Sequence, residues 1–366
     1  ASISVVLGTI AGAAHLAITA LSLGYVDTAT FNVRPGAAAA IQGRPADTAV
    51  YVGGKVPLHS VVVDRYGNPR PDTVTYAMLS GPAALSGSTL TLNAVGRAAV
   101  IGRSGRVFDT TYASGLPLGL IAASGDLGGL FTFNLDGSHY TMLAPTTAGN
   151  VVWAPARTSI AFDQIPYGGY GNAQALLSVT LQGVVSMLDS TYGSLDAWPT
   201  YSHDGQWIYY SKINGGSALW RVHPDGTGDA IVPMQASDGV ESASISPDDS
   251  KVAYVVPGTW SIQVLTLSSG VSASVGVSGL DVQWAPTGNV LAYITTSNQL
   301  ALVPSDGTSG HLLNSGKYLA RLSWSPDGKY LIARNATTFK LDVIDVATGV
   351  ALPVGFTARL GSPSWH

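Results

Sequence analysis

The stretch Trp324-Ser325-Pro326-Asp327-Gly328-Lys329 decides the fold, because it is the fullest copy of a pattern that recurs through the second two-thirds of the chain. Each copy begins at an aromatic or aliphatic residue, which we call its anchor. The six anchors are Trp153, Tyr201, Ile245, Trp284, Trp324 and Trp365. Successive anchors are separated by 48, 44, 39, 40 and 41 residues. Regular self-similarity at this period is typical of a repeat built from four strands, as in a propeller blade.

Each copy has the local chemistry of a tight turn between two strands. Proline fixes φ in the turn and glycine supplies a positive φ. A hydrophobic segment follows, as at 330–333 and 252–256, and a third segment ends in a second turn such as Asp306-Gly307. These segments are too short, and too often interrupted by Gly and Pro, to be helices. The pattern therefore predicts an all-β fold.

The last copy, 358–366, has only its first strand. The three missing strands can be found at 119–145, where short hydrophobic segments flank Asp136-Gly137. We therefore predict that both ends of 119–366 complete one blade, which would close a ring of six blades without a free sheet edge.

The anchor motifs resemble the Trp-Ser-Pro-Asp-Gly-Lys repeats of the TolB-type (PD40) six-bladed β-propeller family, over about two-thirds of the chain. This resemblance implies a propeller. TolB itself carries an α/β domain before its propeller, and no amphipathic helical pattern is present here to build one. The resemblance therefore does not extend to a TolB-specific partner.

The first 118 residues show about seven short segments separated by turn residues, which favours a β-sandwich. The string Val61-Val62-Val63-Asp64-Arg65-Tyr66-Gly67-Asn68-Pro69 resembles the Asp-x-x-Gly-Asn turn of bacterial Ig-like (Big) domains. Those domains lack the inter-sheet disulfide, and this chain has no cysteine. We predict an Ig-like β-sandwich over 1–118, a linker at 116–119, and the propeller over 119–366.

Residues 1–26 carry no Asp, Glu, Lys or Arg. The segment 3–23 is long enough to span a bilayer, so a membrane-associated segment is one interpretation. The alternative is two strands, 3–7 and 14–21, around a turn that contains glycine. Small and polar residues, including His15, dilute the hydrophobicity and favour the strands, although periodicity alone does not separate the two.

Composition excludes several classes of function. The net charge is −4 and no run of Lys or Arg occurs, so the basic footprint of a nucleic-acid-binding protein is missing. The absence of cysteine excludes disulfides, Cys-type zinc sites and Cys nucleophiles. Charged residues make up only 11% and the mean hydropathy is +0.25. One explanation is an all-β fold with many buried faces, and another is a surface partly covered by a partner or lying near a membrane.

No catalytic or cofactor-binding constellation can be picked out. There is no Gly-x-Ser-x-Gly pentapeptide and no paired histidine motif. Asp225 and Asp229 have the short spacing of oxygen ligands in calcium loops, but a β-turn explains them better. The Asp residues lie mostly in repeat turns and Glu241 is the only glutamate, which argues against acid–base machinery.

The irregular parts of the repeats are better candidates for function, because loops on rigid scaffolds often carry it. The longest interval contains Tyr167, Tyr170, Tyr192 and Trp198, which we predict to contact a protein partner. The alternative is that these aromatics cover a blade edge in ordinary loops.

Two functions follow from this pattern. The first is a non-enzymatic interaction or scaffold protein of the bacterial envelope, periplasmic or extracellular. It would be an extrinsic subunit of a larger membrane complex, for example a respiratory or photosynthetic one. The second is a propeller enzyme or small-ligand binder with its site in the central channel. The channel positions are expected to be mostly Ser, Ala and Pro, which favours the first function.

Overall fold

The computed structural model describes residues 8–20, 24–45, 47–164, 174–189, 195–213, 216–235, 239–355 and 359–366. In these ranges the protein forms β-strands, turns and loops and no helix, so the all-β prediction is confirmed. Accordingly, the described residues contain no helix that could span a bilayer. The chain divides into two compact units, Ala1–Gly115 and Leu116–His366, which we call unit 1 and unit 2. The predicted boundary at 118 lies a few residues after this division.

The described strands of unit 1 form four small sheets. One sheet has the order β4 (Thr48–Tyr51), β11 (Val107–Leu116), β10 (Gly96–Ser104) and β7 (Thr75–Ser80). A second has the order β5 (Lys55–Pro57), β9 (Thr89–Leu92) and β8 (Ala83–Ser86). Two-stranded sheets are formed by β3 (Ala38–Gln42) with β6 (Val61–Asp64) and by β1 (Gly12–Ala20) with β2 (Tyr25–Val33). Val56 and Leu90 of the second sheet share a hydrophobic cluster with Val100 of the first, so these sheets bury each other's apolar faces.

The predicted Asp-x-x-Gly-Asn turn is organised by one carboxylate. Asp64 is buried and accepts hydrogen bonds from the backbone N–H groups of Gly36, Tyr66 and Asn68, at 2.8, 2.9 and 3.0 Å. The side-chain amide of Asn68 donates a further bond of 2.8 Å. This bond is the main reason why the pKa of Asp64 lies well below its usual value. Gly67 supplies the left-handed backbone of the turn, with φ of 84°.

The N-terminal hairpin covers the segment for which a membrane-associated element was one interpretation. β1 contains most of the predicted strand 14–21, whereas the predicted strand 3–7 lies outside the described residues. Among the described strands, β1 pairs only with β2. Asn68 links the base of the hairpin to the turn described above, because its amide group bonds to Thr9 O and Ala11 N at 2.7 and 2.8 Å.

In unit 2 the strands of each sheet follow one another along the sequence, except at its two ends. The first sheet has the order β14 (Thr141–Ala144), β13 (Leu130–Asn134), β12 (Leu120–Gly125) and β33 (Leu360–Trp365). The second contains β15 (Ala148–Trp153), β16 (Ser159–Gln164), β17 (Ala175–Thr180) and β18 (Val185–Asp189). The third contains β19 (Leu195–Tyr201), β20 (Ile208–Ile213), β21 (Ser217–Val222) and β22 (Ala230–Ile231).

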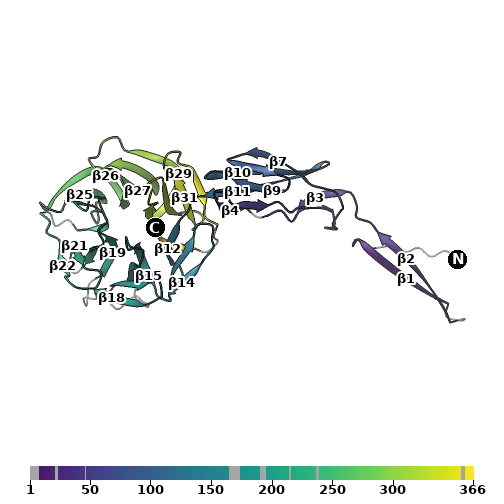
Figure 1. Cartoon of the computed structure of the whole chain (residues 1–366), viewed down its shortest axis with the longest axis horizontal. Helices are drawn as coiled ribbons and strands as arrows, with labels where there is room; N and C mark the ends of the chain where they lie inside the picture. Colours follow the sequence, from purple (N-terminus) through teal and green to yellow (C-terminus); the bar gives the residue numbers. More distant parts are fainter. Residues whose placement is uncertain are drawn as a thin grey trace. The chain divides into compact units, whose positions relative to one another are not determined.

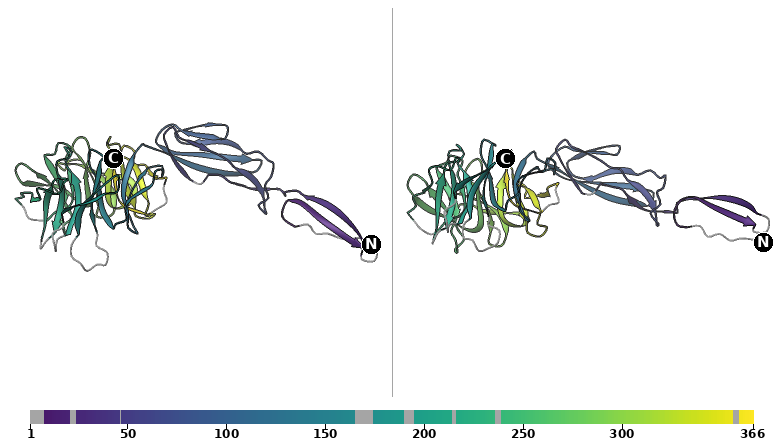
Figure 2. Two further views of the ribbon diagram at one scale, coloured as in Figure 1. Left: turned by 60° about the horizontal axis from the view of Figure 1, so that its bottom comes forward. Right: turned by 90° about the horizontal axis from the view of Figure 1, so that it is seen from below.

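The remaining strands form one ten-stranded sheet that bends at two long strands. Its order is β23 (Glu241–Ile245), β24 (Lys251–Val255), β25 (Ser261–Thr266), β26 (Val271–Trp284), β27 (Val290–Thr295), β28 (Gln299–Pro304), β29 (His311–Trp324), β30 (Tyr330–Asn335), β31 (Leu341–Asp345) and β32 (Ala351–Pro353). The first half of β26 pairs with β25 and its second half with β27, and β29 is divided in the same way between β28 and β30. Figures 1 and 2 show the sheets of unit 2 side by side around a central axis.

The C-terminal strand joins the sheet formed by the start of unit 2. Ile121 of β12 lies opposite Trp365 of β33, and the backbones of Leu120 and His366 exchange hydrogen bonds of 3.2 and 2.9 Å. The sequence-based expectation of a ring without sheet edges needs one correction. No sheet in the described part of unit 2 closes on itself, and β14, β18 and β22 are edges. Neighbouring sheets are held together by side-chain packing instead.

The anchors supply much of this packing. Trp153 belongs to a cluster with Leu130 of the preceding sheet, and Trp324 to a cluster with Ile294. All six anchors are between 3% and 8% exposed. Serine hydroxyls add hydrogen bonds between inner strands of neighbouring sheets. Oγ of Ser364 accepts from the N–H of Trp153 at 3.1 Å, and Oγ of Ser323 accepts from that of Trp365 at 3.0 Å.

The turn after each anchor is held by its serine. In the fullest copy, Ser325 Oγ donates to Asp327 Oδ1 at 2.7 Å and accepts from the N–H of Tyr330 at 2.9 Å. Ser202 and Ser246 make the equivalent bonds in their own turns. These local bonds explain why the Ser-Pro-Asp-Gly pattern recurs.

Replacement of Trp365 by alanine tests the packing of the C-terminal strand. Trp365 is 6% exposed and stacks on Tyr330 with ring centroids 6.4 Å apart. We expect Trp365→Ala to lower the free energy of unfolding of unit 2 by about 3–5 kcal/mol, measured by denaturant titration, because it leaves a cavity between two sheets. Leu127, which is 96% exposed, is the control, and Leu127→Ala should stay within about 0.5 kcal/mol of the parent. Equal stability of the two variants would contradict this role.

Acid titration tests the turn at Asp64. A carboxyl group whose pKa is lowered by folding stabilises the protein fully above its unfolded pKa of about 3.9, and this contribution is lost as the pH falls through the folded value. We therefore expect Asp64→Asn to lower the Tm at neutral pH, and the difference from the parent to narrow progressively below about pH 4. Asp47→Asn is the control, because this carboxylate is 60% exposed and forms only a surface ion pair with Arg97, and it should lower the Tm at neutral pH much less than Asp64→Asn. A difference independent of pH would argue against the role of the ionised carboxylate.

Candidate functional site

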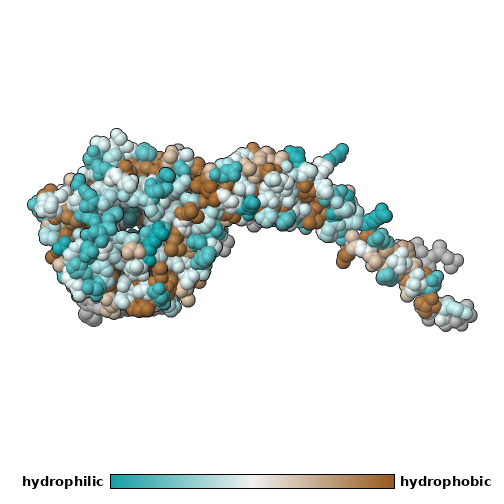
Figure 3. All heavy atoms as spheres, in the orientation of Figure 1, coloured by the Kyte–Doolittle hydropathy of each residue, from teal (hydrophilic) through white to brown (hydrophobic). Residues whose placement is uncertain are grey.

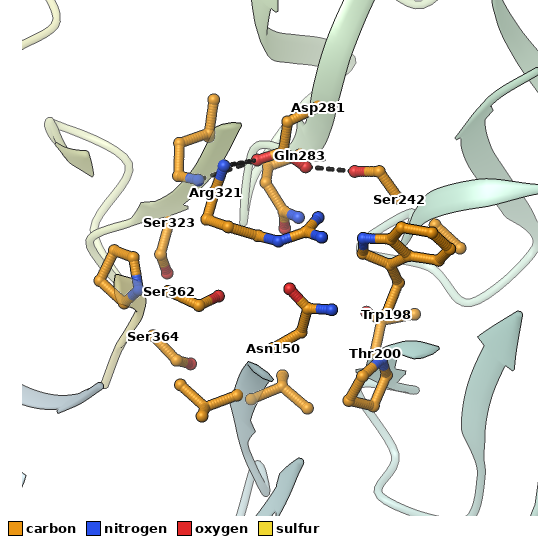
Figure 4. Close-up of a pocket in the computed structure, with 16 residues that line it drawn as sticks. Asn150, Trp198, Thr200, Ser242, Asp281, Gln283, Arg321, Ser323, Ser362 and Ser364 are labelled. Atoms are coloured by element: carbon orange, nitrogen blue, oxygen red, sulfur yellow. Dashed lines mark hydrogen bonds between the residues drawn. The ribbon is translucent and has the colours of Figure 1, made fainter. Parts of the chain in front are cut away.

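One side chain from each inner strand of unit 2 surrounds the central axis. These residues stand three positions before each anchor, and we call them the channel ring. They are Asn150, Trp198, Ser242, Asp281, Arg321 and Ser362. They line a cavity of about 70 Å³ and are drawn in Figure 4. The space-filling view shows the hollow at the centre of unit 2 (Figure 3).

Backbone bulges aim several of these side chains. The pairing of each inner strand with its neighbour shifts register near the channel ring. Trp198, Ser242 and Arg321 have φ values of 55, 47 and 96°, in the left-handed region that residues with side chains rarely occupy. Such conformations carry a conformational cost and cluster at functional sites, where bulges redirect side chains.

Asp281 holds the bulge that carries Arg321. It is 1% exposed, and its Oδ2 accepts hydrogen bonds from the backbone N–H groups of Arg321 and Leu322 at 2.9 and 2.8 Å. Its Oδ1 accepts from the hydroxyl of Ser242. One carboxylate therefore connects three positions on the inner strands β23, β26 and β29, and it fixes the backbone from which the arginine side chain projects.

The guanidinium group of Arg321 lies deep in the channel. Its central carbon is 5.2 Å from the centroid of the Trp198 ring, within the range of a cation–π contact. Burial lowers the pKa of Arg321, while the negative charges of Asp281, Asp163 and Glu241 oppose that shift. Figure 4 shows the side chain extending across the cavity toward Trp198. Within the described part of the protein, the guanidinium nitrogens have no hydrogen-bond acceptor.

Asp163 plays a structural role beside the ring. It is fully buried, and it accepts hydrogen bonds from the backbone N–H groups of Asn150 and Trp198 at 2.9 and 3.1 Å. The side-chain amide of Asn150 donates to its second oxygen. Burial raises the pKa of Asp163 despite these bonds. Burial likewise raises the pKa of Glu241, the only glutamate of the protein.

The two mouths of the channel differ in chemistry. A cavity of about 470 Å³ on one side is lined by Arg321, Asp163, Gln174 and the pair Arg334–Asp126, whose nitrogen and oxygen are 2.5 Å apart. A cavity of about 420 Å³ on the other side is lined by the anchors and the Ser-Pro turns that follow them. Charged groups therefore gather at the first mouth, and aromatic and hydroxyl groups at the second.

The structure brings one of the predicted contact residues into this site. Trp198 forms part of the channel ring, whereas Tyr167, Tyr170 and Tyr192 lie outside the described residues. The expectation that the channel positions are mostly Ser, Ala and Pro was wrong, because the ring also contains a cation, an anion, an amide and an indole. The signal that could have found them is their place three residues before each anchor, where the repeat varies most in chemistry.

The two candidate calcium ligands have other partners. Asp225 accepts from the backbone and hydroxyl of Thr227 at 2.9 and 2.7 Å, as expected for a β-turn. Asp229 accepts from Tyr210, and its Oδ2 is 3.1 Å from the ammonium of Lys212. Within the ranges described, no group of three or more His, Asp or Glu side chains could hold a metal ion.

Replacement of Asp281 tests how the ring is held in place. An asparagine has one acceptor oxygen where the carboxylate has two, so we expect Asp281→Asn to lower the free energy of unfolding by about 1.5–3 kcal/mol. Ser242→Ala removes one donor to Asp281 and also the acceptor of the Val282 backbone N–H, at 3.2 Å, so it should cost about 1–3 kcal/mol. Denaturant titration of both variants measures these losses. If Asp281→Asn were as stable as the parent, the carboxylate would not be holding the bulge.

Comparison by sequence finds no protein family and no curated protein that matches this chain. By structure, the chain is similar to known propellers. TolB from Acinetobacter baumannii matches with a TM-score of 0.56 at 14% identity, over 82% of this chain and 83% of TolB. The putative TolB from Agrobacterium tumefaciens matches with a TM-score of 0.51 at 15% identity, over 67% and 91%. A protein of the nidogen/laminin complex matches with a TM-score of 0.56 at 10% identity, over 68% and 98%. The fold is therefore that of a TolB-type β-propeller.

Proposed function

We propose that this protein is a non-enzymatic protein-binding component of the bacterial envelope, and that its propeller contacts a partner at the charged mouth of the channel. The observation that carries this proposal is the pair formed by Arg321 and Trp198, which face a cavity of about 470 Å³. Arginine and tryptophan are the side chains most often found as energetic hot spots of protein interfaces, where they occupy desolvated pockets.

The proposed architecture extends the strand pairing described above. Bending at β26 and β29 divides the ten-stranded sheet into three four-stranded parts, which together with the other three sheets supports a count of six blades. The shared core of two sheets in unit 1, and the Asp64 turn, support an Ig-like sandwich over 1–118. A propeller of this kind presents a rigid scaffold with a central channel.

A location outside the cytoplasm and membership of a larger membrane complex belong to the same proposal. They are supported by the low content of charged residues and by the exposed apolar side chains of the hairpin β1–β2. Tyr25 and Val26, at one end of this hairpin, are 74% and 61% exposed. Exposed apolar surface of this kind marks contact with a protein or a membrane. The partner would be a subunit of a membrane complex.

One observation favours the alternative of an enzyme or small-ligand binder. Asp163 and Glu241 have raised pKa values and stand beside the channel, which is a property of acid–base catalysts. The oxygens of Asp163, however, accept bonds from Asn150 and Trp198, which suits a structural role. A dialysable ligand detected by native mass spectrometry, in the absence of a protein partner, would favour this alternative.

Site-specific photocrosslinking in the native host tests the proposed function. A photoreactive residue in place of Ser362 lies in the channel ring, and one in place of Leu127 is an exposed control outside it. We expect a defined protein adduct from position 362 in the membrane fraction, and we expect it to be lost with Trp198→Ala. Detergent or high salt should release the complex. The same adducts from both positions, or recovery only as a free monomer, would overturn the proposal.

A further inference from the structure

The guanidinium group of Arg321 has no hydrogen-bond acceptor among the described residues. A guanidinium presents five N–H donors in a planar fork that matches a carboxylate or another oxyanion. The contact recorded for this group is the face of the Trp198 ring, which orients it without accepting its N–H hydrogens in the plane. In the described ranges its donors meet the cavity rather than an acceptor. Leaving such a group unpaired inside a protein is costly.

The neighbouring acids are engaged elsewhere. Both oxygens of Asp281 accept from the hydroxyl of Ser242 and from backbone N–H groups. Those of Asp163 accept from Asn150 and from the backbone of Trp198. These carboxylates therefore shape the site and compensate part of the arginine charge from a distance. They do not form the two parallel hydrogen bonds that a guanidinium makes with a carboxylate.

A second arginine at the same mouth shows the contrast. Arg334 forms an ion pair with Asp126, with 2.5 Å between nitrogen and oxygen. Its charge is thus matched within the protein, and it closes one wall of the cavity. Arg321, which lines the same cavity, has no such ion pair among the described residues. Arg321 therefore presents a guanidinium without an ion-pair partner among the described residues to the space that a ligand would enter.

We infer that the channel mouth at Arg321 binds a carboxylate group carried by the partner, as a free C-terminus or an acidic side chain, in a bidentate pair with the guanidinium. This inference rests on the proposed function, because it assumes that the channel mouth is the contact site. A cavity of about 470 Å³ has the size of a site for a side chain or the end of a polypeptide. The indole of Trp198 would cover the pair on one side and exclude water from it.

The acidic residue near Arg321 provides a second test of this inference. Glu241 contributes a negative charge that acts on Arg321, and its side chain would repel an incoming carboxylate. Neutralising Glu241 should therefore strengthen carboxylate binding, whereas neutralising Arg321 should abolish it. A merely structural arginine would not produce these opposite effects.

The experiment compares one peptide in two chemical forms. The probe is an acetylated pentapeptide of alanine and serine, with either a free C-terminal carboxylate or a C-terminal amide. Sodium acetate and sodium sulfate are tested alongside it. Binding to the full-length protein is followed through the Nε–H resonance of Arg321 in a nitrogen-15 labelled sample, assigned by its loss in Arg321→Gln. Arg221→Gln is the matched control, because Arg221 also lies over a tryptophan ring, that of Trp207 at 4.1 Å, and does not line the channel cavities.

We expect the free-carboxylate peptide to shift the Arg321 resonance and to bind at least about tenfold more tightly than the amide, a difference that one good ion pair can supply. Arg321→Gln should remove the preference, Arg221→Gln should keep it, and Glu241→Gln should increase the affinity several-fold. If acetate saturated the site as effectively as the peptide, the site would still bind a carboxylate, but the assignment of that carboxylate to a protein partner would be overturned.

Three results would overturn the inference. These are equal binding of the carboxylate and amide peptides, an unchanged preference in Arg321→Gln, and tighter binding of sulfate than of acetate. An Arg321 resonance that no carboxylate shifts would have the same meaning. A protein adduct from position 362 that forms equally well in Arg321→Gln would overturn the carboxylate inference and leave the proposed function standing. Absence of both the adduct and carboxylate binding would overturn both.

Discussion

Each sheet of unit 2 has two apolar faces, and only another sheet can cover them. This constraint explains the spacing of the anchors. Trp153, for example, extends from its own sheet into a cluster with Leu130 of the sheet before it. Large aromatic side chains suit this task, because burial of such a side chain contributes about 2–3 kcal/mol. The pairing of β33 with β12 brings the first and last strands of the unit into one sheet, so that the packing continues across them.

The same arrangement creates the channel. Because each repeat places the strand that ends at its anchor next to the axis, one position per repeat faces the channel and escapes the packing requirement. The residue types there are free to differ, and in this protein they do. The positive φ values of Trp198 and Arg321 carry a conformational cost, and the buried hydrogen bonds of Asp163 and Asp281 to these bulges maintain them. The site is therefore preorganised by the backbone of the propeller.

Two cations of unit 2 are paired in different ways. Lys212 is 6% exposed in its side chain, and it pairs with Asp189 and Asp229 at 2.6 and 3.1 Å. Burial lowers its pKa, but the hydrogen bonds of the two carboxylates outweigh this effect and raise it. That charge is matched within the protein, as a structural ion pair must be. Arg321 contacts an indole ring and faces a cavity, which is the arrangement of a group that awaits a ligand.

The sequence by itself determined the local chemistry of the repeat: the Ser-Pro-Asp-Gly turns, the spacing of the anchors and the pairing of 358–366 with 119–145. It could do so because turns depend on residues adjacent in the sequence, and because the incomplete last copy left strands unpaired. Which residues form the channel ring was decided only by the tertiary structure. Asn150, Trp198, Asp281 and Arg321 are far apart in the sequence, and bulges that depend on Asp281 and Asp163 aim them at the axis. Whether a polar residue before an anchor lies in a turn, an interface or a channel depends on these long-range bonds, which no local pattern contains.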